Sequence, residues 1–271
     1  MGKWAKLLFG REAFQDVGII VGGNNPEEMQ VESLRKRFDV VESQTDKAFH
    51  AHLVEGSNGF YPVVFNVYGA AAAIDVLAQM RDGGCRNVLF LGYAYGFGDL
   101  RVGDIVAPHE AYHFDGVYQA LGRDIGMRTR PDKELRLKLI QTLDSEGIEF
   151  HRGKHVSVPA VSLQPSHSNL RYERIHPATL EMELASVYTR SREIGMRSAG
   201  VLVVSDTRND NLGSEENIKI RRETKLGVLD VLLNNLERFS LQPYLENGFS
   251  VDEHLASIVD MPGEEGNAYR E

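Results

Sequence analysis

Two groups of acidic residues stand about 20 positions apart in the segment 178–206, ATLEMELASVYTRSREIGMRSAGVLVVSD. Glu181-Met182-Glu183 open a stretch that predicts a helix, and Ser205-Asp206 follow an apolar run, 201–204, that predicts a buried strand. In open α/β sheets, ligands bind outside the carboxyl ends of the strands. Two carboxylates there can divide the work of a reaction, one binding hydroxyl groups and one donating a proton. The alternative is that the glutamates are ordinary acids of a first helical turn and that Asp206 caps a loop.

A second candidate for chemistry is the turn that follows the first predicted strand, Asp16–Val21. The sequence there reads Gly-Gly-Asn-Asn-Pro-Glu-Glu over positions 22–28. Glycine and asparagine allow unusual backbone angles and a close approach of a ligand. Asn25-Pro26 followed by two acids predicts the start of a helix. Glu27 and Glu28 therefore stand either at a ligand site or in an ordinary solvated first turn.

The rest of the chain alternates apolar strands with amphipathic helices, which is typical of an α/β fold. Asp132 and Ser214 are the predicted caps of two of the helices. A last helix is expected near 251–259. The other predicted strands are 38–41, 48–55, 62–67, 87–92, 111–116 and 151–158, and the other predicted helices are 70–81, 132–146 and 214–239.

The motifs and their order resemble the purine nucleoside and uridine phosphorylase superfamily, which includes the methylthioadenosine/S-adenosylhomocysteine nucleosidases. Met-Glu followed by an apolar strand and Ser-Asp is one shared pattern, and the segment 100–108, LRVGDIVAP, is similar to the Val-Gly-Asp-x-Val segment of that family. The resemblance covers roughly residues 17–240. It implies one α/β domain over 1–271, a three-layer sandwich with a central mixed β-sheet, and a loose acidic tail from about residue 260.

The resemblance also implies roles at the acidic groups. The family cleaves the N-glycosidic bond of a nucleoside and releases the base. Glu183 would hold the 2′ and 3′ hydroxyls of the ribose, Met182 would pack on the sugar, and Asp206 would protonate a purine as it leaves. Glu181 and Ser205 join them as expected substrate-binding residues.

Further substrate contacts are expected from the turns after the predicted strands 16–21 and 87–92, at Gly23 and at Gly92-Tyr93. In the family, a neighbouring subunit also contributes a residue from the region of His52. We therefore expect a homo-oligomer, either a dimer, a trimer or a hexamer of dimer units.

The nucleophile is water or phosphate. The phosphorylases of the family carry an arginine after the first strand and a second one two residues before the glycine that corresponds to Gly92. Here Glu27 and Glu28 follow the first strand and Phe90 fills the second position, with Tyr93 where a phosphate-binding hydroxyl is expected. Because acids repel phosphate, we favour water activated by Glu27 or Glu28. No cofactor is expected, and phosphate is a co-substrate only in the phosphorylase alternative.

A third possibility is a nucleoside-binding protein without catalysis. The segment 159–165, PAVSLQP, lacks the aromatic residue that stacks on the base in the family, and the glycine turns are altered. Tight nucleoside binding without turnover would support this alternative.

Composition excludes several classes of protein. The net charge of −9, with no long Lys/Arg block, argues against nucleic acid as a partner. The absence of an apolar run of 18 residues argues against a membrane span. The single cysteine, Cys85, fits a reducing cytoplasm. His50 and His52 alternate onto one strand face, but we see no third ligand at a suitable spacing and expect no metal site.

Overall fold

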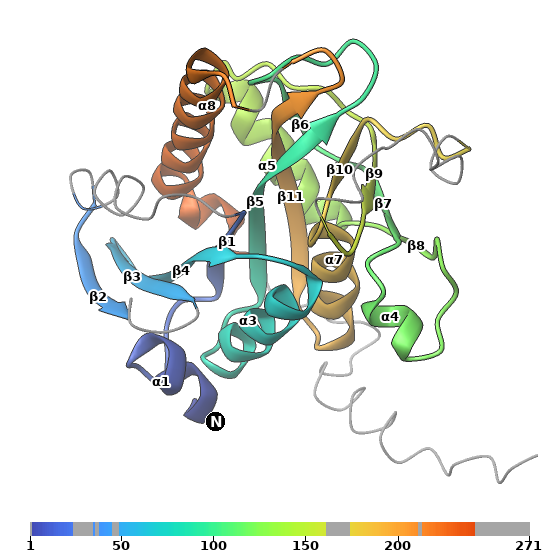
Figure 1. The fold of residues 1–271 in the computed structure, drawn as a ribbon. Coiled ribbons are helices and arrows are strands. Elements are labelled where there is room, and N and C mark those ends of the chain that lie inside the picture. The colour runs from blue at the N-terminus through green and yellow to red at the C-terminus, as the bar shows by residue number, and fades with distance from the viewer. Residues whose placement is uncertain are drawn as a thin grey trace, which may run out of the picture. The chain divides into compact units, whose positions relative to one another are not determined.

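The computed structural model describes residues 2–23, 35, 38–44, 49–160, 174–210 and 213–241 (Figure 1). Contacts within the chain separate a unit Met1–Leu241 from a unit Gln242–Glu271. The second unit contains the helix predicted at 251–259 and the acidic tail, and it lies outside the described residues. A single domain over 1–271 therefore stays a prediction.

The described strands join in one sheet of eleven. They are β1 Val17–Gly22, β2 Val40–Gln44, β3 His50–Gly56, β4 Gly59–Val67, β5 Asn87–Gly96, β6 Ile105–Val106, β7 Glu110–His113, β8 Arg128–Thr129, β9 Lys154–Ser157, β10 Thr179–Glu181 and β11 Arg197–Thr207. The helices are α1 Lys3–Phe9, α3 Ala70–Asp82, α4 Val117–Ala120, α5 Lys133–Ser145, α7 Leu184–Glu193 and α8 Glu215–Asn234, with a 3₁₀ turn, η2, at Leu236–Phe239.

The sheet is mixed, as predicted. Its main path runs β2-β3-β4-β1-β5-β10-β9-β7-β8, and β11 pairs with β5 and β6. The pairs of β1 with β4, β1 with β5 and β11 with β5 are parallel, whereas β2-β3, β3-β4 and β10-β5 are antiparallel. Because β1, β5 and β11 run the same way, their carboxyl ends meet at one edge, which is where ligands of such sheets bind.

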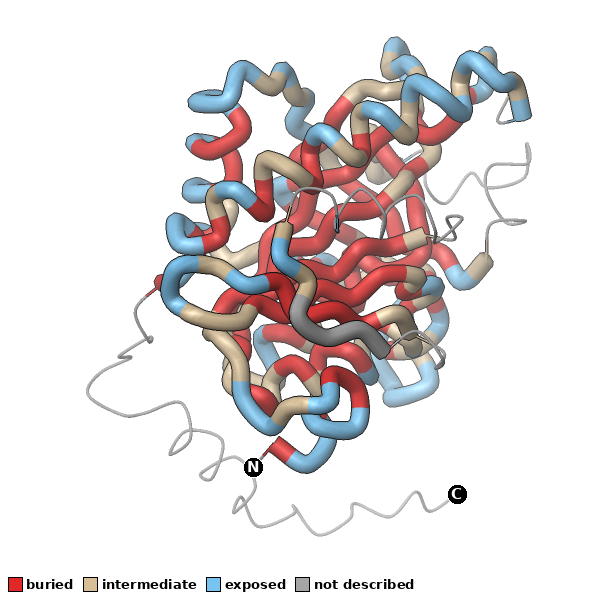
Figure 2. Tube along the Cα trace, turned by 90° about the vertical axis from the view of Figure 1, so that its left-hand side faces the viewer, coloured by how far each residue is buried: buried red, intermediate tan, exposed pale blue. Residues whose placement is uncertain are grey.

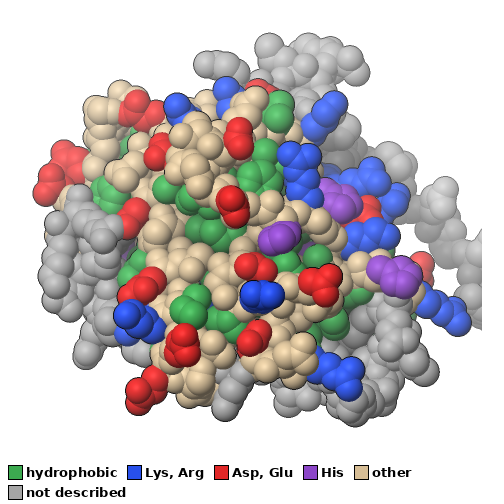
Figure 3. All heavy atoms as spheres, turned by 90° about the horizontal axis from the view of Figure 1, so that it is seen from above, with side chains coloured by type: hydrophobic (Ala, Val, Ile, Leu, Met, Phe, Trp, Pro, Cys, Tyr) green, Lys and Arg blue, Asp and Glu red, His purple; other side chains and the backbone are tan. Residues whose placement is uncertain are grey.

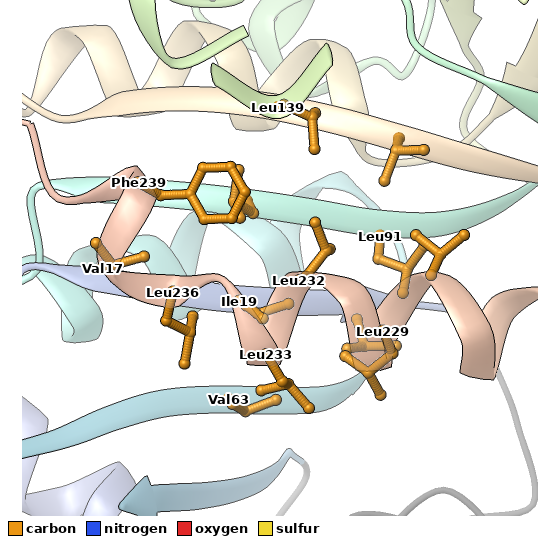
Figure 4. Packing of buried hydrophobic residues seen from close by; sticks show 14 of the residues in the cluster. Val17, Ile19, Val63, Leu91, Leu139, Leu229, Leu232, Leu233, Leu236 and Phe239 are labelled. Atoms are coloured by element: carbon orange, nitrogen blue, oxygen red, sulfur yellow. The ribbon is translucent and has the colours of Figure 1, made fainter. Parts of the chain in front are cut away.

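Alternate residues of the central strands face two separate cores, as strand geometry requires. One core packs β1, β5 and β11 against α5, α8 and η2 (Figure 4). Val17, Ile19 and Leu91 point from the strands toward Leu232 and Phe239 in that figure. The spacing of the α8 residues in this core, Val228, Leu229, Leu232 and Leu233, is that of one helix face.

The second core lies on the opposite face of the sheet, against α1, α3 and α7. Ile20, Val88 and Leu202 come from the strands, and Leu77 and Leu184 come from the helices. The tube view shows the buried residues gathered in the strands, with exposed positions on the outer sides of the helices (Figure 2). Helices on both faces of a mixed sheet form the three-layer sandwich that the sequence predicts.

Local capping signals work as the sequence predicts. The side chain of Asp132 accepts a hydrogen bond from Leu135 N at 2.9 Å, and Ser214 accepts one from Asn217 N at 3.2 Å. These bonds satisfy backbone N–H groups that have no partner within the helix. They fix where α5 and α8 begin.

Several boundaries differ from the sequence predictions. The turn expected at Gly92-Tyr93 is wrong, because β5 continues to Gly96 and pairs both residues with β11. Glu181 does not begin the helix but ends a three-residue strand, β10, and α7 starts after Glu183. The last strand is longer than its apolar run, because β11 continues to Thr207 along β5. The long helix ends at Asn234 rather than near Phe239, since Asn235 turns its side-chain amide back onto Val231 O at 2.9 Å and the chain tightens into η2.

Candidate active site

The junction between β10 and α7 positions the acidic triplet. Glu183 is the residue before the first turn of α7, and its side chain is only 4% exposed. Its Oε1 accepts a hydrogen bond of 2.5 Å from the backbone N–H of Gly69, which stands between β4 and α3. Met182 is buried beside Glu183. Its methyl carbon lies 3.9 Å from the position that a Cβ atom on Gly69 would occupy. The start of α7 and the start of α3 therefore meet at Glu183.

Glu181 is held by a buried network. Its Oε1 lies 2.6 Å from His155 Nε2 and accepts a 2.7 Å bond from the hydroxyl of Ser157. Its carboxylate also accepts the backbone N–H groups of Glu183 and Leu184 at 2.6 to 3.0 Å. A carboxylate with this many donors is fixed in one orientation. Glu181 thus fixes the backbone from which Glu183 projects.

The two carboxyl groups of the triplet are hydrogen-bonded to each other and buried. Burial raises the pKa of Glu183 well above its usual range, and the charge of Glu181 raises it further. Burial also raises the pKa of Glu181, while the bonds from Glu183 and Ser157 oppose that rise. Like charges this close do not ionise together, so the pair holds one proton near neutral pH.

His155 takes no charge in this network. Burial lowers its pKa to about 3, although the charge of Glu183 acts in the opposite direction. Its other ring nitrogen, Nδ1, lies 2.9 Å from the hydroxyl of Thr179. His155 is therefore a neutral imidazole that links β9 to β10.

Asp206 stands near the carboxyl end of β11 and is 9% exposed. The hydroxyl of Ser205 donates to its Oδ1 at 2.5 Å, and that hydroxyl also lies 3.2 Å from Ala94 O on β5. Burial raises the pKa of the Asp206 carboxyl, and the Ser205 bond and the guanidinium of Arg221 oppose the rise. A carboxyl with a raised pKa suits proton donation near neutral pH.

The register of the sheet brings the two acidic groups together. In β5, Tyr95 pairs with Leu180 of β10 on one side and with Asp206 of β11 on the other. Neighbouring strands lie about 4.8 Å apart, so Leu180 and Asp206 are about 10 Å apart across Tyr95. Glu181 follows Leu180 directly. The triplet and Asp206, distant in the sequence, thus lie on either side of one tyrosine.

Aromatic and sulfur-containing side chains surround this position. Tyr95 and Phe97 meet edge to face with ring centroids 5.1 Å apart. They pack with Met182, Tyr112 and Phe114 in a small cluster separate from the two main cores. Burial raises the pKa of the Tyr95 phenol, and the charge of Asp206 raises it further. Flat apolar side chains beside the two acids suit a planar aromatic group of a ligand.

Two predicted site glycines, Gly22 at the end of β1 and Gly92 within β5, are close-packed. A Cβ on Gly22 would lie 2.5 Å from the ring of Phe90, and one on Gly92 would lie 2.6 Å from the same ring. Gly23, with φ 95°, donates its backbone N–H to Val67 O at 3.0 Å. The Phe90 ring therefore fills the space between Gly22 and Gly92.

Tyr93 is half-buried within β5, next to Gly92. Its hydroxyl lies 3.4 Å from Arg221 O, and burial raises the pKa of Tyr93 to about 12. The ammonium of Lys225 lies 4.0 Å from the centre of its ring. Sequence reasoning missed Lys225. The available signal was a lysine at the spacing of the apolar face of α8, three and four residues before Val228 and Leu229.

The remaining predicted site residues are not brought to this position. His52 is buried on β3, where its ring meets Phe65 at 5.5 Å, and burial lowers its pKa to about 4. Its predicted role belongs to a neighbouring subunit, which one chain does not test. Glu27, Glu28 and the segment 161–173 after β9 lie outside the described residues.

Among the described residues, no group of three or more His, Cys, Asp or Glu side chains is arranged to hold a metal ion. None of the helices in that same part of the chain is both long and apolar enough to cross a membrane. Seen from above, acidic side chains are scattered over the face of the molecule and Lys and Arg gather toward one margin (Figure 3).

Comparison with known proteins decides the family. The family described as "Phosphorylase superfamily" matches residues 19–238. The chain belongs to the phosphorylase superfamily. The resemblance that the motifs suggested is thereby confirmed, and the chain is an enzyme of the superfamily's N-glycosidic bond-cleaving type.

Solved structures of the superfamily share the fold. The 5′-methylthioadenosine/S-adenosylhomocysteine nucleosidase of Campylobacter jejuni has 15% identity and a TM-score of 0.66, over 81% of this chain and 98% of its own. The futalosine hydrolase of Helicobacter pylori has 18% identity and a TM-score of 0.65, and the match covers 82% of this chain and 98% of the hydrolase. The purine nucleoside phosphorylase of Toxoplasma gondii has 16% identity and a TM-score of 0.71, and the match covers 84% of this chain and 94% of the phosphorylase. Hydrolases and phosphorylases are both among these neighbours.

Proposed function

We propose that this protein hydrolyses the N-glycosidic bond of a nucleoside and releases the base. Glu183 accepts hydrogen bonds from the sugar hydroxyls, Met182 packs on the sugar, and Asp206 gives its proton to the departing base. The observation that carries the proposal is the pairing of Tyr95 with Leu180 on one side and Asp206 on the other, which places the triplet and the second acid on either side of one residue.

The two acids differ as this reaction requires. Cleavage leaves positive charge on the sugar and negative charge on the base. Burial raises the pKa of both acids, but their neighbours differ. Glu183 shares a proton with Glu181, so the pair keeps a negative charge that suits the sugar, whereas Asp206 is bonded to Ser205 and can give its own proton to the base. Glu181 is saturated by His155, Ser157 and two backbone N–H groups, which supports a positioning role. Its contact with substrate stays a prediction.

Water is the nucleophile that we favour. Phosphate is bound best by fixed arginine side chains and backbone N–H groups. The ring of Phe90 fills the space between Gly22 at the end of β1 and Gly92 within β5. Activation of water by Glu27 or Glu28 stays a prediction, since both lie outside the described residues. One observation favours the phosphorylase alternative, because a cation attracts phosphate. The ammonium of Lys225 donates a hydrogen bond to the carbonyl of Gly22 at the carboxyl end of β1.

The aromatic cluster gives a reason to place a planar base beside Tyr95. Edge-to-face aromatic contacts are worth about 0.5–1.5 kcal/mol beyond their buried area. We propose that Tyr95 and Phe97 do part of the work of the stacking residue that is missing from 159–165. Ser205 acts by orienting Asp206, and Gly23, Gly92 and Tyr93 form the wall on the nucleophile side. Cofactor independence, a homo-oligomer and a cytoplasmic location stay predictions.

The test is base release from a panel of nucleosides, followed by chromatography with and without phosphate. The panel includes 5′-methylthioadenosine, S-adenosylhomocysteine and futalosine, after the names of the structural neighbours, together with adenosine, inosine and uridine. We expect release from at least one of them that does not depend on phosphate. A strict requirement for phosphate makes the protein a phosphorylase. Tight binding without turnover, unchanged in Asp206→Asn, supports the non-catalytic alternative.

A further inference from the structure

Lys225 is a buried cation for which the mechanism above has no role. It lies on α8 and is 2% exposed. Its ammonium donates a 2.7 Å hydrogen bond to the carbonyl of Gly22 and stands 4.0 Å from the centre of the Tyr93 ring. Burial of an ammonium group is costly unless it is paired. A leucine or methionine would fill this place on the apolar face of α8 without that cost.

The position of this cation relative to the acids follows from the sheet. Gly22 ends β1, and in the parallel ladder it pairs with Val67, which ends β4. Two residues after Val67, Gly69 donates its N–H to the carboxylate of Glu183. The ammonium and the carboxylate are thus held by neighbouring strand ends. Burial lowers the pKa of Lys225, and the charge of Glu183 acts in the opposite direction.

A carbonyl and an aromatic face contact the ammonium, and the charge of the Glu183 carboxylate acts on it from the neighbouring strand end. Each favours a positive charge at this point. The site then carries one negative charge, on two carboxyl groups that share a proton, and one positive charge, on the ammonium. Such a buried arrangement is neutral when Glu183 or Glu181 alone is ionised, which keeps the desolvation cost low.

We propose that Lys225 is a positioning residue of the site, whose ammonium biases Glu183 toward its ionised form and so prepares it to accept the sugar hydroxyls. The proposal deepens the function proposed above and rests on it. Without the ammonium, burial and the charge of Glu181 would leave Glu183 protonated over a wider pH range. A protonated carboxyl group binds two hydroxyls less well, because it has lost charge-assisted hydrogen bonds.

Lys225 titrates in the range in which the enzyme is assayed. Burial lowers its pKa to about 7, and the charge of Glu183 opposes that shift. Two groups act on its charge directly, the ring of Tyr93 from β5 and the carboxylate of Glu183 at the start of α7. Further charged or titratable groups act on these two: Arg221 and Arg222 of α8 on Tyr93, and Glu181 of β10 and His155 of β9 in the network of Glu183. Of these, His155 is neutral at the relevant pH and the phenol of Tyr93 keeps its proton.

The test compares Lys225→Met and Lys225→Arg with the wild-type protein on a ribonucleoside and its 2′-deoxy counterpart. Methionine keeps the length of the side chain and removes its charge, and arginine keeps the charge. The matched control is Lys138→Met, a lysine on the exposed side of α5. Because methionine suits a buried site, we expect the variant to fold, and thermal unfolding checks it.

We expect Lys225→Met to lower kcat/KM for the ribonucleoside roughly 10- to 100-fold, mainly through KM, since a lost charge-assisted hydrogen bond has about that effect. The 2′-deoxynucleoside should lose far less, so the preference for the ribonucleoside shrinks. The acid limb of the pH profile, which reports ionisation of Glu183, should move to higher pH. Lys225→Arg should restore the limb and most of the preference.

Equal losses on both nucleosides with an unmoved acid limb would overturn the proposal while the cleavage activity of the wild-type protein stands. If the wild-type protein cleaves nothing, the proposed function has failed, and calorimetry of the same two nucleosides then decides on Lys225. A preference for the ribonucleoside in binding that Lys225→Met removes would keep its role. An unchanged preference, or no binding to the wild-type protein, would reject it.

Discussion

Replacing Asp206 by asparagine removes one transferable proton and little else. The two side chains have nearly the same size, and the hydroxyl of Ser205 can still donate to the amide oxygen, as it donates to Oδ1 over 2.5 Å. General acid catalysis contributes about 10²- to 10⁴-fold to a rate. At about 1.36 kcal/mol for each tenfold step, this loss equals roughly 2.7 to 5.4 kcal/mol of transition-state stabilisation. We expect kcat to fall by that factor while KM stays within about threefold.

The pH dependence of the wild-type protein follows from the same group. Burial raises the pKa of Asp206, so its protonated form persists to higher pH than in an exposed aspartate. Activity that needs this proton falls as the pH rises through the raised pKa. A carboxyl group whose pKa is higher in the folded state destabilises that state above its unfolded pKa. Asp206→Asn should therefore be at least as stable as the wild-type protein at pH 7.

The assay compares two leaving groups. A natural nucleoside needs protonation of its base, whereas a 4-nitrophenyl riboside releases a good leaving group without a proton. Asp206→Asn should lose its full factor on the nucleoside and less than about tenfold on the nitrophenyl substrate. Equal losses on both would refute proton donation by Asp206. Retention of more than about a tenth of the activity on the nucleoside would refute it as well.

Three other changes test the site and its support. Glu183→Gln should reduce kcat/KM on a ribonucleoside roughly 10- to 100-fold and on a 2′-deoxynucleoside much less, because a neutral amide accepts hydroxyl protons weakly; comparison of the two substrates checks it. The pKa of His155 is about 3 in the folded state against 6.5 in the unfolded chain, so the stability that it contributes is present above about pH 6.5 and is lost as the pH falls toward 3. Denaturant titrations at several pH values should show that the free energy of unfolding falls less steeply with falling pH in His155→Asn than in the wild-type protein. An unchanged pH dependence would contradict the neutral imidazole. Leu232→Ala removes a fully buried side chain between α8 and the sheet. Urea unfolding should show a free energy of unfolding lower by about 2–5 kcal/mol. A decrease of less than about 1 kcal/mol would argue against this packing.

The fold could be predicted from the sequence where a local signal and the tertiary structure agree. The run 201–204 is apolar on both faces of the sheet, and Asp132 is both a cap by type and a cap by position. The length of β11 could not be predicted, because Ser205 to Thr207 join the strand through pairing with β5 and not through their own character. The three residues of β10 are too few for a periodic signal, which is why Glu181 was expected to open a helix.

The candidate site shows the same division. Glu183 and Asp206 could be predicted from residue type and spacing, but their common neighbour Tyr95 is a matter of strand register. The network of Glu181 with His155 also depends on register, since β9 and β10 pair Ser157 with Glu181. Lys225 was missed for another reason. A lysine in an amphipathic helix is normally expected at the solvent, and only the packing of α8 against the end of β1 buries it.

The identity of the sugar product tests the central claim most directly. A cleaved nucleoside is incubated with the protein at a saturating concentration of phosphate, and the sugar is identified by chromatography and by phosphorus NMR. Hydrolysis yields one free sugar for each base released, and the account predicts this result at every phosphate concentration. A sugar 1-phosphate in equal amount to the base would contradict water as the nucleophile and make the protein a phosphorylase.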